Sequence, residues 1–169
     1  MRSLIKSART ERAKGHTTGF SLIELLVVVA VILIIASIAI PNFIKSKMRA
    51  NEAAVQNLRN ISTAEVVYST TYGIGFSDNL VKLTSTSAVV DQNNAGLIDE
   101  VLASGTKSGY VYTFAVLSTD SQGHVTGYSV STDPISAGNT GVRHFYTDQT
   151  AVIRFNGTTT AGPGDTPIS

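Results

Sequence analysis

The stretch that decides the fold reads Thr18-Gly19-Phe20-Ser21-Leu22-Ile23-Glu24, and an almost unbroken apolar run follows it as far as Ile40. From Leu25 to Ile40 the only polar residue is Ser37. The wider segment from Phe20 to Ile40 has 21 residues, close to the ~20 that a transmembrane helix needs. Glu24 is the exception, because a charged side chain near a bilayer centre costs at least ~2.5–3.5 kcal/mol on insertion scales. We therefore expect Glu24 to have a specific partner.

Basic residues precede the apolar segment. Residues 1–19 contain five lysines and arginines against one glutamate, which gives a net charge of +4 with His16 neutral. A secretory signal also has a basic start, but its apolar region spans about 7–15 residues and ends at a small-residue cleavage site. Here the apolar run is longer and is followed by Pro41-Asn42-Phe43. These features alone favour an uncleaved N-terminal membrane anchor.

The order of residues from Gly19 to Val27 resembles the processing site of type IV pilins and type II secretion pseudopilins. The shared features are a basic leader that ends in Gly19, then Phe20, then Glu24, and an apolar helix with Pro41 inside its length. The resemblance implies that a prepilin peptidase cuts the Gly19–Phe20 bond and methylates the new amino group of Phe20. Residues 1–19 would then be a cleaved leader, and the apolar run would remain in the mature protein.

The resemblance also implies a partner for Glu24. In a helical filament, the free amine of Phe20 on one subunit pairs with the Glu24 carboxylate of its neighbour and sets the register of assembly. A charge that is costly to leave alone in apolar surroundings selects arrangements that pair it. The alternative is that Glu24, only four residues into the segment, extends its carboxylate to the lipid headgroups.

Charge distribution predicts the orientation in the membrane. The five cations of residues 1–19 exceed the three that follow the apolar run, Lys45, Lys47 and Arg49, so the N-terminus is expected in the cytoplasm of an inner-membrane protein with a periplasmic C-terminal domain. Without the leader, eight cations face eleven acids, a net charge of about −3. This leaves no basic field for a nucleic-acid partner. The chain has no cysteine, so no disulfide supports the fold.

Helical periodicity continues beyond the apolar run. Apolar residues recur at a spacing of three to four at Ala50, Ala54, Leu58, Ile61, Tyr68 and Tyr72. One helix of roughly 80 Å is the economical interpretation at about 1.5 Å per residue, with residues 20–40 as membrane or filament core and 41–72 as an amphipathic continuation. Pro41 cannot donate a backbone hydrogen bond and is predicted to kink this helix; the alternative is that a helix boundary falls there.

The rest of the chain predicts a small antiparallel sheet. Gly73 and Gly75 are expected to end the helix, and residues 73–108 to form a connecting loop with a short helix over 96–103, capped by Asn93 or Asn94. Residues 109–155 predict two hairpins, of 110–117 with 125–132 and of 142–147 with 151–155. Residues 156–169 predict a mobile tail. The expected fold is α+β and pilin-like: a long N-terminal helix packed on the sheet.

No pattern indicates an enzyme. The three histidines, His16, His124 and His144, stand in no recognisable catalytic or metal-binding motif, and no catalytic residue, cofactor or metal ligand is predicted. After Asp148 the only carboxylate side chain is Asp165, whereas a calcium site wants six to eight oxygens. The calcium loop of major pseudopilins is therefore not expected.

Three functions remain open. The first is the subunit of a type IV pilus-like filament, a homopolymer whose implied partners are the prepilin peptidase, an inner-membrane assembly platform with its ATPase, and the bilayer before assembly. The second is the major pseudopilin of a type II secretion system, in a periplasmic filament. The third is a membrane-anchored periplasmic binding protein that never polymerises. The missing calcium-loop pattern favours the pilin-like filament subunit, and the assembled filament is expected either as a pilus at the cell surface or in the periplasm.

Overall fold

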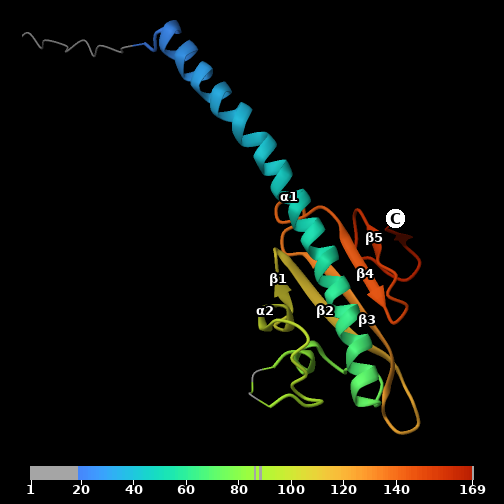
Figure 1. The fold of residues 1–169 in the computed structure, drawn as a ribbon. Helices are drawn as coiled ribbons and strands as arrows, with labels where there is room; N and C mark the ends of the chain where they lie inside the picture. The colour runs from blue at the N-terminus through green and yellow to red at the C-terminus, as the bar shows by residue number, and fades with distance from the viewer. Residues whose placement is uncertain (1–18, 86, 88, 169) are drawn as a thin grey trace, which may run out of the picture. The chain divides into compact units, whose positions relative to one another are not determined.

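The computed structural model describes residues 19–85, 87 and 89–168, and the predicted leader, with His16, lies outside these residues apart from Gly19. The chain forms two compact units, residues 1–39 and 40–169. A single helix, α1 (Leu22–Tyr72), begins in the first unit and ends in the second. A six-stranded antiparallel sheet follows it in the sequence (Figure 1). The fold is α+β, as predicted.

The first unit is an apolar helix without an apolar partner of its own. Its large apolar side chains, from Phe20 to Ile38, are 47–81% exposed, and of its described residues only Ala36 is half-buried. Within the part of the chain that the structure describes, α1 is the helix long and apolar enough to cross a membrane. The apolar surface therefore needs cover from outside the unit.

In the second unit, α1 carries the buried stripe that the sequence predicts. Ala54, Leu58, Ile61 and Tyr68 are each at most 1% exposed. The helix ends where expected, because Gly73 takes a left-handed φ of +68° while its N–H donates to Ser69 O at 3.0 Å. Glycine adopts this conformation without the steric cost that a Cβ brings. The predicted periodicity and helix end are both confirmed.

The connector contains two short helices. A 3₁₀ helix, η1 (Leu80–Leu83), buries both of its leucines, and α2 (Glu100–Ala103) is capped by Asp99, whose carboxylate accepts from Leu102 N at 3.0 Å. The predicted helix over 96–103, capped by Asn93 or Asn94, is therefore too long and wrongly capped. Gly96 has a φ of +66°, which breaks a right-handed helix at that point.

The sheet is wider than predicted. Its strands are β1 (Thr106–Lys107), β2 (Tyr110–Thr119), β3 (Val125–Pro134), β4 (His144–Asp148), β5 (Arg154–Asn156) and β6 (Thr166–Pro167). They pair antiparallel in sequence order. Both predicted hairpins are present, β2–β3 and β4–β5. The sheet predicted over residues 109–155 did not include the two edge strands, β1 and β6.

The expectation of a mobile tail after residue 155 is wrong for the described part of that segment. Ile168 N donates to Ile153 O at 2.9 Å as β6 pairs with β5, and Ala161 is only 4% exposed. The Asp165 side chain organises the turn between the two strands by accepting from Asn156 Nδ2 at 3.0 Å and from Gly162 N at 2.8 Å. These bonds order a segment whose amino-acid composition is typical of a loop, which is why the prediction failed.

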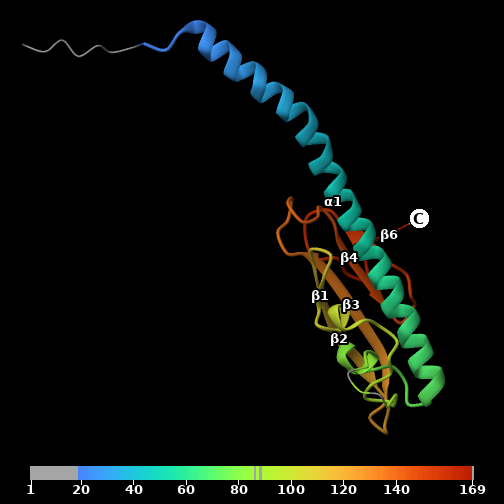
Figure 2. The ribbon, with the colours of Figure 1, turned by 60° about the vertical axis from the view of Figure 1, so that its left-hand side comes forward.

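Two asparagines fasten α1 to the sheet, and the part of α1 that belongs to the second unit runs along one face of it (Figure 2). Tyr110 OH donates to Asn51 Oδ1 at 2.5 Å, and Asn57 Nδ2 donates to Tyr112 OH at 2.9 Å. Asn57 is only 5% exposed, and buried polar groups of this kind are hydrogen-bonded as a rule. The bonds therefore fix the position of the helix on β2 in addition to the apolar contacts.

Candidate processing and assembly site

The predicted scissile bond lies before the first turn of α1. Gly19 and Phe20 precede the helix, which begins at Leu22. Phe20 is 81% exposed, and a Cβ placed on Gly19 would meet no atom within 4 Å. An uncovered peptide bond outside regular secondary structure is the form that a protease accepts. The geometry thus agrees with processing at Gly19–Phe20, which stays a prediction.

Glu24 has a partner within its own chain. Leu25 N donates the first helical bond to Ser21 O at 3.2 Å, so Ser21 is the N-cap and Glu24 the third helical residue. The Ser21 N–H donates to Glu24 Oε2 at 3.4 Å, which is the glutamate half of a capping box. The carboxylate also lies at the positive end of the helix dipole, where negative charge is stabilising. The Ser-x-x-Glu spacing signals this role in the sequence, and we missed it there.

Cleavage would change the electrostatics of this first turn. A free amine on Phe20 would put a positive charge at the positive end of the helix dipole, which costs ~0.3–1 kcal/mol at an exposed helix end. A carboxylate near that amine offsets the cost. Among the described residues, Glu24 Oε1 accepts no hydrogen bond, so one oxygen of the side chain is available for an amine. Gly19, Phe20 and Glu24 all belong to the first unit, so the cleavage site and the carboxylate that would offset the new charge are parts of the same short segment.

Pro41 belongs to the second unit. It stands inside α1, and helical residues continue on both sides of it, so the alternative of a helix boundary there is wrong. Its missing N–H removes the bond that Ser37 O would otherwise accept. The predicted kink at Pro41 stays a prediction.

Glu65 is a charged residue that we missed in the sequence. Its side chain is 0% exposed and accepts from Ser77 N at 2.8 Å and from Ser77 Oγ at 2.5 Å. Burial raises the pKa of the carboxyl to about 7, although the two Ser77 bonds oppose that shift. Glu65 lies four residues after Ile61 on the buried stripe, so helical spacing could have identified it. It holds the loop after α1 against the helix.

The described histidines have structural partners. His124 Nδ1 lies 3.1 Å from Asp120 Oδ2, and His144 Nδ1 lies 2.5 Å from Asp133 Oδ1. Within the described ranges, no group of three histidine or acidic side chains is arranged to hold a metal ion. The two histidine–aspartate contacts therefore stabilise a turn and two neighbouring strands. The candidate functional residues are those at the start of α1.

Comparison with known proteins points to the same residues. Residues 15–40 match the family model described as the prokaryotic N-terminal methylation motif. The chain is similar to the type IV major pilin protein PilA of Myxococcus xanthus, with 48% identity over 58 residues, which are 34% of this chain and 26% of that protein. It is also similar to the type IV wide pilus major component of Thermus thermophilus, with 48% identity over 40 residues, 24% of this chain and 30% of that protein.

A longer match extends into the C-terminal domain. A fimbrial protein of Pseudomonas aeruginosa is 31% identical over 116 residues, which cover 59% of this chain and 75% of that protein. The matches to the Myxococcus and Thermus proteins span less than a third of either relative. No solved structure matches the chain significantly. The identity and coverage of the fimbrial match, together with the motif, show that the chain belongs to the family of type IV pilins and fimbrial proteins.

Proposed function

We propose that this protein is the structural subunit of a type IV pilus-like filament. The subunit is anchored in the inner membrane by residues 20–40, with residues 1–19 in the cytoplasm and the C-terminal domain in the periplasm. A prepilin peptidase cuts after Gly19 and methylates Phe20, and an assembly platform with its ATPase adds the subunit to the filament. The motif match and the pilin and fimbrial names of the relatives support this proposal.

The observation that carries the proposal is the uncovered apolar helix. Fifteen large apolar side chains between Phe20 and Ile40 are 47–81% exposed. Burying such a side chain contributes ~1.5–3 kcal/mol, so the set represents roughly 20 kcal/mol or more. A free energy of this size means that the helix does not stay exposed to water in the working protein. Lipid covers the helix before assembly, and the same helices of neighbouring subunits cover it afterwards.

Glu24 is the residue at which a simple anchor and an assembling helix would differ. An anchor needs only the helix cap that Glu24 supplies, whereas a filament core gains in addition a specific pairing with the amine of Phe20 on a neighbour. The capping bond from Ser21 N explains how the isolated subunit accommodates the side chain. On assembly, the free oxygen of the carboxylate receives the neighbour's amine.

The test is Glu24→Gln, because glutamine at this position keeps the capping acceptor and loses only the charge. The variant is expected to insert and to be cleaved, yet to yield few filaments by electron microscopy of sheared cells. Ser21→Ala is the matched control: it keeps the backbone N–H that donates to Glu24 and leaves the charge, so filaments should persist. Normal filaments from Glu24→Gln would rule out the pairing.

The location of the filament separates a pilus from the periplasmic filament of a secretion system. The related proteins are pilus and fimbrial components, so we place the filament at the cell surface. Labelling of intact cells with an antibody against the C-terminal domain should mark surface fibres. Labelling that requires permeabilised cells would favour the pseudopilin.

A further inference from the structure

A groove runs between α1 and the C-terminal edge of the sheet. It has a volume of about 380 Å³ and is lined on α1 by Glu52, Val55 and Arg59, and on the sheet side by Arg143, Phe145 and Ile168. A second hollow of about 220 Å³ adjoins it and shares Glu52 and Arg143. The groove therefore combines an apolar floor with two guanidinium groups.

The charges of this groove are not balanced within the described structure. Arg59 and Arg143 are both exposed, and neither forms an ion pair with a carboxylate among the described residues. The Arg143 guanidinium lies 4.9 Å from the centre of the Phe155 ring, which leaves its edge open for an acceptor. Glu52 supplies one negative charge against the two positive ones. A single carboxylate from outside would balance the groove.

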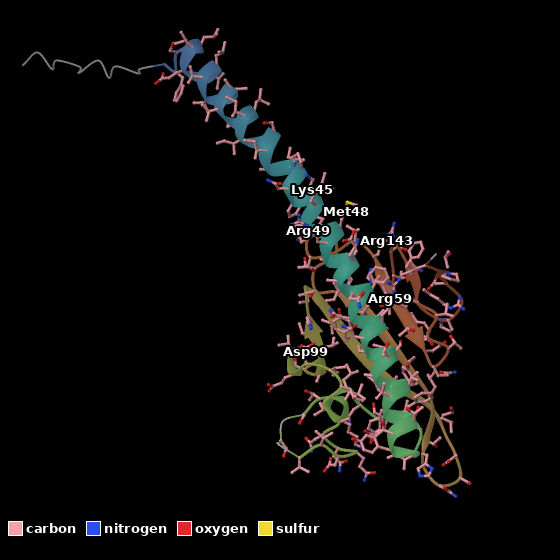
Figure 3. The ribbon with its side chains drawn as sticks, viewed as in Figure 1. Lys45, Met48, Arg49, Arg59, Asp99 and Arg143 are labelled. Atoms are coloured by element: carbon pink, nitrogen blue, oxygen red, sulfur yellow. The ribbon has the colours of Figure 1, made fainter. Side chains whose placement is uncertain are left out.

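The opposite edge of the domain carries a complementary surface, here called the α2 corner, which is formed by Asp99, Glu100 and Val101. Helix α2 lies at the β1 edge, where Asp99 Oδ2 pairs with Lys107 Nζ at 2.6 Å, while the groove lies at the β4 and β6 edge. Glu100 is exposed without an ion pair in the described residues, and Val101 beside it is 57% exposed. Figure 3 shows Asp99 on one side of α1, and Arg59 and Arg143 on the other. The corner thus offers a carboxylate with an adjacent apolar side chain.

We propose that the groove of one copy receives the α2 corner of a second copy. The Glu100 carboxylate lies between the guanidinium groups of Arg59 and Arg143, and Val101 packs on the apolar floor. The contact joins two different surfaces on opposite edges of the same domain, and repeating such a heterologous contact generates an open helical polymer. This inference rests on the proposed filament function and assigns a second subunit contact, outside the apolar helix.

Charge reversal tests the contact in the full-length protein in its own cells. Arg59→Glu and Glu100→Arg, each alone, should lower the mass of sheared filaments about tenfold or more, because a like charge across the interface replaces a pair. The double reversal restores the pair between residues 59 and 100 but leaves Arg143 opposite an arginine, so it should recover part of the yield, about threefold or more above either single reversal. Gln122→Arg, which changes the charge at the exposed β2–β3 turn, is the control and should leave the yield unchanged.

Crosslinking provides a measurement that does not depend on yield. The chain has no cysteine, so Arg59→Cys with Glu100→Cys places the only two thiols at the proposed contact. A short bismaleimide should convert filaments of this variant into a ladder of covalent multimers, whereas Gln122→Cys with Glu100→Cys should give none. Filaments that form without a ladder, or single reversals that assemble normally, would overturn the contact and leave the filament function standing. Absence of filaments from the unaltered protein would overturn both.

Discussion

Replacement of Glu65 by glutamine is the sharpest test of the domain's energetics. The carboxylate is fully buried and accepts two hydrogen bonds from Ser77, with Asp78 adding a repulsive charge from the same loop. Tyr68 on α1 and Tyr128 on β3 are the titratable groups that its charge affects from the surrounding elements. Glutamine retains an acceptor oxygen for Ser77 N but cannot ionise.

The expected magnitude follows from linkage. The pKa of Glu65 rises from 4.5 to about 7 in the folded state, so the native protein binds a proton between these pH values where the unfolded chain does not. The stabilisation is fully present below pH 4.5 and is lost as the pH rises through about 7. At 1.36 kcal/mol per pKa unit, this loss is about 3 kcal/mol. Because part of this stabilisation is already lost at pH 5, the unaltered protein should be less stable at pH 8 than at pH 5 by about 2–3 kcal/mol through this one group.

The assay is urea unfolding of the full-length subunit in detergent at pH 5 and pH 8, followed by near-ultraviolet circular dichroism of the buried tyrosines. Glu65→Gln should lose most of the difference between the two free energies of unfolding. Every other ionisable group is common to the two proteins, so subtraction of the two pH dependences isolates Glu65. The same pH dependence in both proteins would refute the reasoning.

Three further changes have defined outcomes. Gly75→Ala places a Cβ 2.2 Å from Val125 O at a φ of +81°, so the free energy of unfolding should fall by about 2 kcal/mol or more, measured by urea unfolding. Asn57→Ala leaves the buried Tyr112 hydroxyl without its donor and should cost about 1–3 kcal/mol in the same assay. Gly19→Val should block cleavage, so intact-mass measurement should find the leader still attached.

The first two of these changes have matched controls. Gly123→Ala adds a Cβ at a similar φ of +86° where nothing lies within 4 Å, so it should cost less than Gly75→Ala; an equal loss would exclude the close approach as the cause. Tyr112→Phe, combined with Asn57→Ala in a double-mutant cycle, isolates the hydrogen bond between them. Additive losses would show that the bond contributes nothing. Efficient cleavage of Gly19→Val would remove the role assigned to that glycine.

Local patterns predicted much of this fold. The spacing of apolar residues indicated the helix to Tyr72 because one face of α1 meets the sheet, and Gly73 ends it because only a left-handed residue fits there. The β2–β3 and β4–β5 hairpins followed from runs of strand-forming residues. The β6 strand was missed because its order comes from a side chain, Asp165, which bonds to residues that propensity assigns to loops.

The candidate functional residues also divide into those that local sequence order identifies and those that depend on distant partners. Gly19, Phe20 and Glu24 are identified by their order along the chain, and the capping box could have been found from Ser21 and Glu24. Glu65 was missed because its partner, Ser77, lies twelve residues away across a turn. An assembly contact joins two copies of the chain, so its geometry is absent from one subunit and has to be inferred from unbalanced charge.

Mass spectrometry of the N-terminal peptide from purified filaments tests the central claim most directly. If the apolar helix forms the filament core after processing at Gly19–Phe20, the filaments contain this chain, and its first residue is N-methylated Phe20. A peptide that begins at Met1, or filaments that lack this chain, would contradict the account.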